Sequence, residues 1–282
     1  MDWLTDLITN TKIPVGRTAK ITFDWLKANA SGLFQAISDG LNALIGGILW
    51  CLETPNPFVI IAVFVALTWI LRRNWITCVG VVLGFLFILN QDYWQETMQS
   101  LTLILAACVV CMGVGVPVGI AAAHRPRLYA WMRPVLDLMQ TLPTFVYLIP
   151  AIVFFGIGMV PGLVATVIFV LPAPIRLTHL GISTTPPALV EAATAFGATG
   201  RQLLWKVELP SALPQIMAGL NQTIMLSLSM VVIAAMVGAD GLGVKVVRAL
   251  NSVNTAMGFE SGVVIVVVAI MLDRMLRVER RK

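Results

Sequence analysis

One stretch, residues 187–210, decides the fold of this chain, and it reads PALVEAATAFGATGRQLLWKVELP. It is the longest polar interval between strongly apolar blocks. Thr185 stands where it can cap a helix that begins at Pro186 or Pro187, since the first turn of a helix does not need the N–H that proline lacks. Gly197 supplies the left-handed conformation that stops such a helix. The first half of the stretch therefore predicts one short helix.

The second half of the stretch predicts another short helix. Thr199 and Gln202 have the spacing of a capping box. We expect Pro210 to end this helix, because the residue before a proline is biased away from helical geometry. The two helices then meet at a sharp angle and present a face of small and apolar side chains, formed by Ala188, Leu189, Ala192, Ala195 and Phe196.

The composition indicates a protein embedded in a bilayer. Hydrophobic residues make up 58% of the 282 residues and charged residues 12%, and the mean hydropathy is +0.89. Apolar runs near the length of a membrane span recur, whereas barrel strands would alternate apolar and polar residues. The predicted fold class is therefore all-α, a polytopic bundle of membrane helices. The net charge of +5 bears on topology rather than on nucleic acid, and no nucleic-acid partner is expected.

The chain divides into three regions. Residues 1–56 are the least hydrophobic, residues 57–95 carry two apolar runs, and residues 96–278 carry five more. A basic loop, His124–Arg133, joins the third run to the fourth, which Pro143 interrupts. We expect about seven transmembrane helices, over residues 58–71, 75–89, 97–123, 135–155, 161–177, 212–237 and 262–272.

Residues 33–52, in the N-terminal region, have an amphipathic helical pattern. Polar residues follow one stripe and apolar residues the opposite one. This pattern predicts a helix that lies on the bilayer surface outside the cytoplasm. An eighth span is the alternative, because residues 41–52 are apolar enough to enter the bilayer, and it would move the N-terminus to the cytoplasm.

The connection between the last two predicted spans also has a helical pattern. It begins with the glycine-rich segment Gly238–Gly243. Apolar residues then recur every three or four positions, at Val244, Val247, Leu250, Val253 and Met257. We expect a helix that lies at, or dips into, the outer face of the bundle.

The spacing within residues 187–210 resembles the EAA loop of ABC-transporter permeases. The matching positions are Glu191, Ala192, Ala193, Gly197, Leu209 and Pro210, with Val207 where isoleucine is commoner. In that family the loop is cytoplasmic and docks into a groove on an ATP-hydrolysing subunit. The resemblance implies a coupling role for Glu191, Ala192, Ala193, Gly197, Arg201, Leu209 and Pro210.

Enzymatic motifs are missing from the sequence. It contains no GxxxxGK[ST] loop, no HExxH pair and no supported Ser-His-Asp set. Cys108 and Cys111 have CxxC spacing but lie within an apolar run, where buried small hydrophobic residues are expected. We therefore expect no catalytic residue, no cofactor and no metal site, with ATP bound by a partner subunit.

Basic residues indicate the orientation. Most of the 19 Lys and Arg residues, Arg176 among them, fall in predicted loops or the tail on the side of residues 187–210. Because Lys and Arg favour the cytoplasmic side, we expect the EAA loop and the C-terminus to be cytoplasmic and the N-terminus to be periplasmic.

Polar residues within the predicted spans are candidates for the translocation path, since such residues are costly in lipid. Asp137 has Arg133, one turn earlier, as a candidate ion-pair partner. For any single Ser or Thr, an interhelical hydrogen bond is the alternative role. As a group, we expect the path to be lined by Gln140, Thr141, Thr144, Asn221, Gln222, Ser227 and Ser229.

Three further runs, Met139–Pro150, Pro172–Thr178 and Met236–Gly243, resemble permeases for glycine betaine, choline and proline betaine. The resemblance implies a type I ABC importer permease of the bacterial inner membrane. Its implied partners are a second copy of the chain, two cytoplasmic ATPase subunits, a periplasmic solute-binding protein and the lipid bilayer.

Three questions about the solute and the energy source stay open. The resemblance does not separate choline from glycine betaine. One rival is an ABC importer for another small polar solute, such as an amino acid or a sulfonate. The other is an ion-driven secondary transporter, for which inverted repeats and buried ion ligands would be expected.

Overall fold

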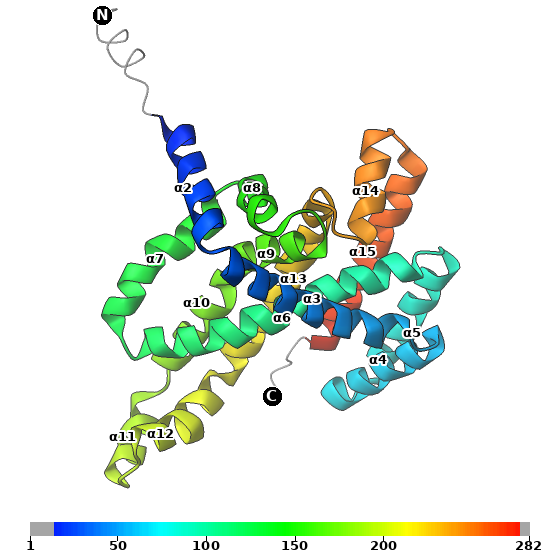
Figure 1. Ribbon diagram of the computed structural model, residues 1–282. Helices are drawn as coiled ribbons and strands as arrows, with labels where there is room; N and C mark the ends of the chain where they lie inside the picture. Colours follow the sequence, from blue (N-terminus) through cyan, green and yellow to red (C-terminus); the bar gives the residue numbers. More distant parts are fainter. Residues whose placement is uncertain (1–13, 277–282) are drawn as a thin grey trace, which may run out of the picture.

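The computed structural model describes residues 14–276, over which all regular structure is helical (Figure 1). The all-α prediction is thus confirmed for this part of the chain. Predictions that concern residues 1–13 and 277–282, including most of the basic tail, lie outside the described residues. The helices are α2 (Val15–Asn29), α3 (Ser31–Glu53), α4 (Pro57–Arg72), α5 (Trp75–Asn90), α6 (Trp94–Ala123), α7 (Pro126–Thr141), α8 (Thr144–Phe155), α9 (Met159–Val170), α10 (Pro172–Ser183), α11 (Pro187–Ala195), α12 (Gly200–Leu203), the π-helical turn η1 (Leu204–Glu208), α13 (Leu209–Ala235), α14 (Leu242–Asn251) and α15 (Thr255–Leu276).

Within residues 14–276, five helical stretches are long and apolar enough to cross a membrane. They are Ser31–Glu53, Trp94–Ala123, Met159–Ser183, Gly200–Ala235 and Thr255–Leu276, and α7 with α8 makes a sixth if that bent pair counts as one span. Helices α4 and α5, predicted as the first two spans, form as expected but have 16 residues each. The polytopic helical bundle is thus confirmed.

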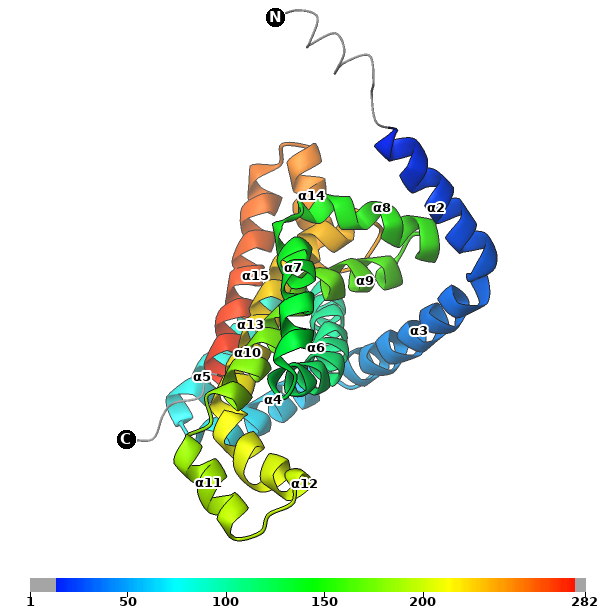
Figure 2. The ribbon, with the colours of Figure 1, turned by 90° about the vertical axis from the view of Figure 1, so that its left-hand side faces the viewer.

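Helices α6, α10 and α13 pack together in the centre of the bundle (Figure 2). Glycines allow this close approach, since a Cβ added at Gly119 of α6 would lie 2.7 Å from the carbonyl oxygen of Ile175 in α10. A Cβ at Gly181 of α10 would likewise meet Ala212 of α13 at 2.9 Å. Small residues at such contacts are typical of membrane helices, where van der Waals packing rather than hydrophobic burial favours association.

The predicted interruption of the fourth span, residues 135–155, at Pro143 is confirmed, and the break is sharp. Helices α7 and α8 meet at 98° around Pro143. The predicted basic loop His124–Arg133 is instead mostly helix, because α7 already begins at Pro126. Proline is well tolerated in the first turn of a helix, whereas Pro143 withdraws a hydrogen-bond donor from the helix interior and breaks it.

The predicted amphipathic helix over residues 33–52 corresponds to α3. This helix packs against α6, α8 and α9, and Phe34 stacks on Phe154 of α8 with ring centroids 4.4 Å apart. Phe23 of α2 meets the same Phe154 ring edge-on at 5.5 Å. Since α3 also passes the length test for a span, its position on the bilayer surface stays a prediction.

The helix predicted after Gly238–Gly243 is α14, although it ends before Val253 and Met257. The amide of Leu242 donates to Ser100 Oγ of α6 (2.8 Å), and the ammonium of Lys245 lies 2.9 Å from the Glu96 carboxylate. Nearby, the Tyr93 hydroxyl donates to Glu260 (3.3 Å). Burial and the carboxylates of Glu260 and Glu96 raise the pKa of Tyr93.

Candidate functional site

A helical hairpin formed by α11 and α12 projects from one end of the bundle (Figure 2). Each of the nine residues of α11 is at least partly exposed, and the helix packs against α12 and η1. Three large apolar side chains around the hairpin are exposed: Leu189 by 50%, Phe196 by 93% and Trp205 by 63%. Exposed apolar side chains gathered on one projection mark an interaction surface.

The turn of this hairpin has the predicted local chemistry. Gly197 adopts φ +77°, a left-handed conformation that favours glycine. The amide of Ala198 donates to the carbonyl of Ala193 (3.0 Å), which closes the end of α11. The capping box is also confirmed: the Thr199 amide donates to Gln202 Oε1 (2.9 Å), and the Gln202 amide donates to Thr199 Oγ1 (3.4 Å).

Thr185 does not cap α11, contrary to the sequence prediction. The N-cap position is occupied by Pro186, and the buried hydroxyl of Thr185 has no hydrogen-bond partner among the described residues. Because the helix begins at Pro187, Thr185 stands one position too early for its side chain to reach the free amides of the first turn.

Pro210 does not end the second helix, which is a further correction. The chain continues through η1 into α13 as one stretch from Gly200 to Ala235. In the wide turn of η1 the amide of Leu209 donates to the Leu204 carbonyl, and Pro210 falls in the first turn of α13, where its missing N–H is tolerated. The hairpin is therefore joined to a core helix without a flexible linker.

A polar contact fixes the base of the hairpin to α6. The carboxylate of Glu208, buried in η1, lies 2.9 Å from Nε2 of His124 at the end of α6. The other ring nitrogen, Nδ1, is 2.9 Å from the carbonyl oxygen of Ile120. The sequence analysis gave Glu208 no role and did not pair it with His124, because 84 residues separate the two in the sequence.

The predicted coupling residues occupy two levels of this hairpin. Those near its tip are exposed or half-buried: Glu191, Ala192, Ala193, Gly197 and Arg201. The other two lie at the base, where Leu209 packs against the cluster of Ile182, Ala212 and Ile216, while Pro210 is exposed. Arg201 also lines a shallow cavity with Thr199, Gln202, Trp205 and Lys206.

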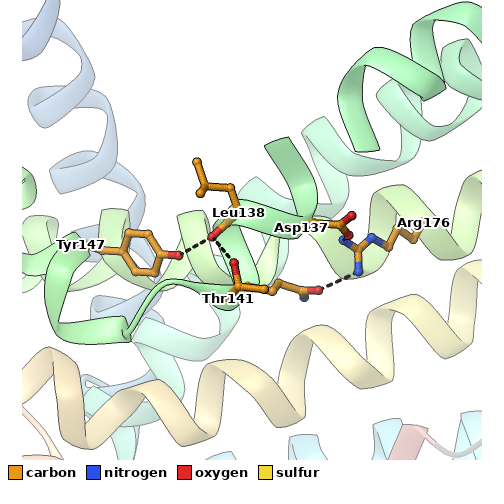
Figure 3. A network of polar contacts seen from close by, with 6 residues as sticks. Asp137, Leu138, Thr141, Tyr147 and Arg176 are labelled. Carbon is orange, nitrogen blue, oxygen red and sulfur yellow. Dashed lines mark hydrogen bonds and ion pairs between the residues drawn. The ribbon is translucent and has the colours of Figure 1, made fainter. Parts of the chain in front are cut away.

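The break between α7 and α8 forms a second polar region (Figure 3). In a continuous helix the Met139 carbonyl would accept from residue 143, but that residue is Pro143 and has no N–H. The buried hydroxyl of Tyr147 donates to this carbonyl instead (2.6 Å) and also lies 3.3 Å from the Leu138 carbonyl. Tyr147 therefore stabilises the break, a role that the sequence analysis missed.

The candidate path residues of α7 and α8 lie beside this break. Gln140 Oε1 accepts from Arg176 Nη1 (2.8 Å), and the Thr141 hydroxyl is 3.4 Å from the Leu138 carbonyl. Thr144 begins α8. Arg176 lies in α10 and not in a loop, which corrects the predicted distribution of loop charges.

The candidate pairing of Asp137 with Arg133 is wrong. Asp137 Oδ1 accepts from Arg176 Nη2 at 2.6 Å. The observed partner lies 39 residues away in the sequence, whereas the sequence pattern identifies only neighbours one helical turn apart. This contact joins the end of α7 to α10.

The candidate path residues of α13 point in different directions. Gln222 and Ser229 are exposed on one side of the helix. Asn221 instead bonds to Asp273 of α15 (3.4 Å), and Ser227 is buried, with a hydroxyl that has no partner among the described residues. The structure therefore brings Gln140 close to a charged pair but does not bring the four polar residues of α13 together.

Spanning helices, small-residue packing and a projecting hairpin indicate a multi-pass membrane protein with an exposed interaction surface. The family described as binding-protein-dependent transport system inner membrane component matches residues 115–277, and the chain belongs to this family. It is therefore a transport subunit and not an enzyme. The transport systems of this family also contain a binding protein and an ATPase. The expected family resemblance is confirmed.

Curated relatives cover most of the chain. It is 46% identical to the glycine betaine transport system permease protein OpuAB of Bacillus subtilis, over 93% of each chain. It is 45% identical to the glycine betaine/carnitine transport permease protein GbuB of Listeria monocytogenes, over 89% of this chain and 90% of that protein. The glycine betaine/proline betaine permease protein ProW of Escherichia coli is 41% identical, over 97% of this chain and 81% of its own length.

A solved structure supports the fold. The chain superposes on a chain of the inward-facing MetNI methionine ABC transporter with a TM-score of 0.57 and 24% identity, over 64% of this chain and 92% of the other. The expected fold of a type I importer permease is therefore confirmed.

Proposed function

We propose that the chain is the permease of an ATP-driven importer for quaternary ammonium osmolytes and that residues 187–210 couple it to a separate ATPase. The solute class is supported by the names of the relatives, which include glycine betaine, carnitine and proline betaine permeases. The coupling role is carried by one observation: α11 projects with every residue at least partly exposed and with Phe196 93% exposed at its end.

The connection of the hairpin to the core supports a lever mechanism. Helix α12 continues through η1 into α13, and the Glu208–His124 contact joins the same turn to α6. A displacement of α11 and α12 by an ATPase subunit therefore acts directly on α13, which packs against α6, α9, α10 and α15. Closure of the ATPases on ATP would turn the bundle from an inward-open to an outward-open state, as alternating access requires.

The proposed assembly contains two copies of the chain, two cytoplasmic ATPase subunits and a periplasmic solute-binding protein. The hairpin and the end of α15 lie at one end of the bundle, and α2 begins at the opposite end (Figure 2). With the hairpin in the cytoplasm of a bacterium, the C-terminal end is cytoplasmic and the N-terminal end is periplasmic. The excess of basic residues on the hairpin side supports this orientation.

Reconstitution in proteoliposomes tests the proposal. The chain is incorporated with its ATPase, and uptake of labelled glycine betaine is measured with solute-binding protein outside and ATP inside. We expect uptake that needs ATP and the binding protein and is reduced by unlabelled carnitine or proline betaine, but not by an amino acid such as methionine. Uptake driven by an ion gradient without ATPase would instead identify a secondary transporter. Competition by an amino acid or a sulfonate alone would identify another solute class.

A further inference from the structure

Arg176 lies within the bundle, where its guanidinium contacts the side chains of Asp137 and Gln140. It belongs to the helical stretch Met159–Ser183, which is long and apolar enough to cross a membrane. Its neighbours Pro174 and Leu177 pack against Gly219 of α13, which lies about 15 Å along that helix from its first residue at 1.5 Å per residue. The backbone of Arg176 therefore lies about 10 Å inside the carboxyl end of its spanning stretch, at seven residues and 1.5 Å per residue.

Two side chains in the last turns of α7 share this guanidinium. Nη2 of Arg176 donates to Asp137 (2.6 Å) and Nη1 donates to Gln140 (2.8 Å) (Figure 3). The carboxyl end of α7 also carries the partial negative charge of a helix terminus. Because Tyr147 holds the break beyond it, a cationic group and an anionic group stand side by side at a fixed helix end.

One side of this ion pair is open. The side chain of Asp137 is 54% exposed and that of Arg176 is 32% exposed. Charged groups at membrane depth face the interior of a transporter or a water-filled cavity, because contact with hydrocarbon is costly. The open side of the pair would meet this requirement by facing the translocation path of the proposed assembly.

We propose that Arg176 and Asp137 form the charged contact through which the path recognises a dipolar solute, one with a quaternary ammonium at one end and a carboxylate at the other. The inference rests on the proposed function. The solute carboxylate replaces Asp137 and Gln140 on the guanidinium, whose planar fork binds a carboxylate through two N–H groups. The ammonium then faces the released carboxylate of Asp137 and the carboxyl end of α7.

A partly exposed ion pair suits such a transient contact. Water competes for both partners, so the pair is weak and opens readily. The exchange with a dipolar solute leaves each charge opposite a partner of the other sign, and the pair re-forms when the solute leaves. A solute that carries only the ammonium, such as choline, has no carboxylate with which to displace Asp137. The contact therefore favours betaines over simple cations.

Four variants of the complete transporter test this inference in proteoliposomes. They are Arg176→Gln, the uncharged double variant Asp137→Asn/Arg176→Gln, the charge-retaining Arg176→Lys, and the control Arg133→Gln, which removes an exposed arginine from α7 outside the pair. Two quantities are measured for each: uptake of glycine betaine, and ATP hydrolysis stimulated by the loaded solute-binding protein. The second shows whether the subunits still assemble and respond.

The double variant is decisive, because its two amides can still hydrogen-bond to each other but carry no charge. We expect it and Arg176→Gln to lower uptake about tenfold or more, as loss of charge-assisted bonds predicts, with stimulated hydrolysis and the control within about twofold of wild type. Arg176→Lys should transport more than Arg176→Gln.

Wild-type uptake by the double variant would overturn the inference and would mean that the pair only holds α7 against α10. Loss of stimulated hydrolysis together with uptake, in the single and double variants alike, would also overturn it by assigning the pair to folding. A wild-type transporter that takes up no glycine betaine would contradict the proposed function itself, and so the two failures are distinguishable.

Discussion

The two ends of the bundle each carry a short helix, and these helices are packed in opposite ways. At one end α11 leaves all nine of its residues at least partly exposed, with Phe196 93% exposed beside it. Helix α14, at the other end (Figure 1), has ten residues. It buries Leu242 and Ala249 and is fixed to α6 by Ser100 and Glu96.

This difference separates a short helix that needs packing from a partner from a short helix that its own chain packs. Helices shorter than about 12–15 residues are marginal in water without packing, and α11 receives little packing from its own chain. Helix α14, in contrast, is packed by its own chain, through its buried residues and its contacts with α6. The two helices are almost equal in length, so burial and not length distinguishes an interaction element from a structural one.

The largest expected effect comes from the exposed aromatic residue at the hairpin. Phe196→Asp should weaken binding of the ATPase by about 3 kcal/mol, or roughly a hundredfold, because an aromatic anchor at the centre of an interface carries a large share of the affinity. Copurification of the ATPase and uptake should both be lost. The control is Leu250→Asp at the opposite end, where Leu250 is 77% exposed. Equal loss of the ATPase in both variants would contradict the comparison.

A smaller effect is expected from backbone strain in the hairpin. Gly197→Val places a β-branched residue at φ +77°, which costs on the order of 1–3 kcal/mol. We expect uptake to fall roughly tenfold, because a distorted turn misplaces α11 on its partner. The matched control is Gly200→Val, where an added side chain meets open space and the backbone is helical. Similar uptake by the two variants would count against a fixed hairpin shape.

The base of the hairpin should be less sensitive than its tip. Glu208→Ala removes the contact with His124, and because the His124 side chain is 46% exposed the loss is about 1 kcal/mol after solvent screening. Uptake should fall roughly fivefold with the ATPase still bound. Glu208→Gln keeps an acceptor for the imidazole and should fall less. Release of the ATPase by Glu208→Ala would place this residue in the interface rather than behind it.

The smallest effect is expected at the outer end. Lys245→Met breaks the ion pair with Glu96. The side chain of Lys245 is 32% exposed and that of Glu96 is 21% exposed, and such pairs contribute about 1 kcal/mol or less to stability. The melting temperature should fall by roughly 1–4 °C with uptake unchanged. The double variant Lys245→Met/Glu96→Gln should recover part of that loss. A transport defect as large as that of Gly197→Val would remove the distinction between the two ends.

The sequence predicts the hairpin well because its determinants are local. The left-handed Gly197 and the capping box of Thr199 and Gln202 are set by residues within one turn of each other. Pro143 likewise predicts that one helical hydrogen bond is missing, because proline has no N–H to donate. It does not reveal that Tyr147 would supply the missing donor, or that the two helices would meet at 98°.

Two of the contacts that the sequence analysis missed join segments that are distant in the sequence. Arg176 pairs with Asp137 across 39 residues, and Glu208 pairs with His124 across 84. A helical pattern offers only partners three or four residues away, so it suggested Arg133 for Asp137. Helix packing decides these pairs, and packing is fixed by the glycine contacts of α6, α10 and α13 rather than by local sequence.

Amide hydrogen exchange of the permease, with and without its ATPase, tests the central claim most directly. The amides of residues 187–198 should exchange quickly in the permease alone and slow by about tenfold or more when the ATPase is bound, whereas those of α14 should not change, because exchange reports local opening. Unchanged exchange in residues 187–198 of an active complex, or equal protection of α14, would contradict the account.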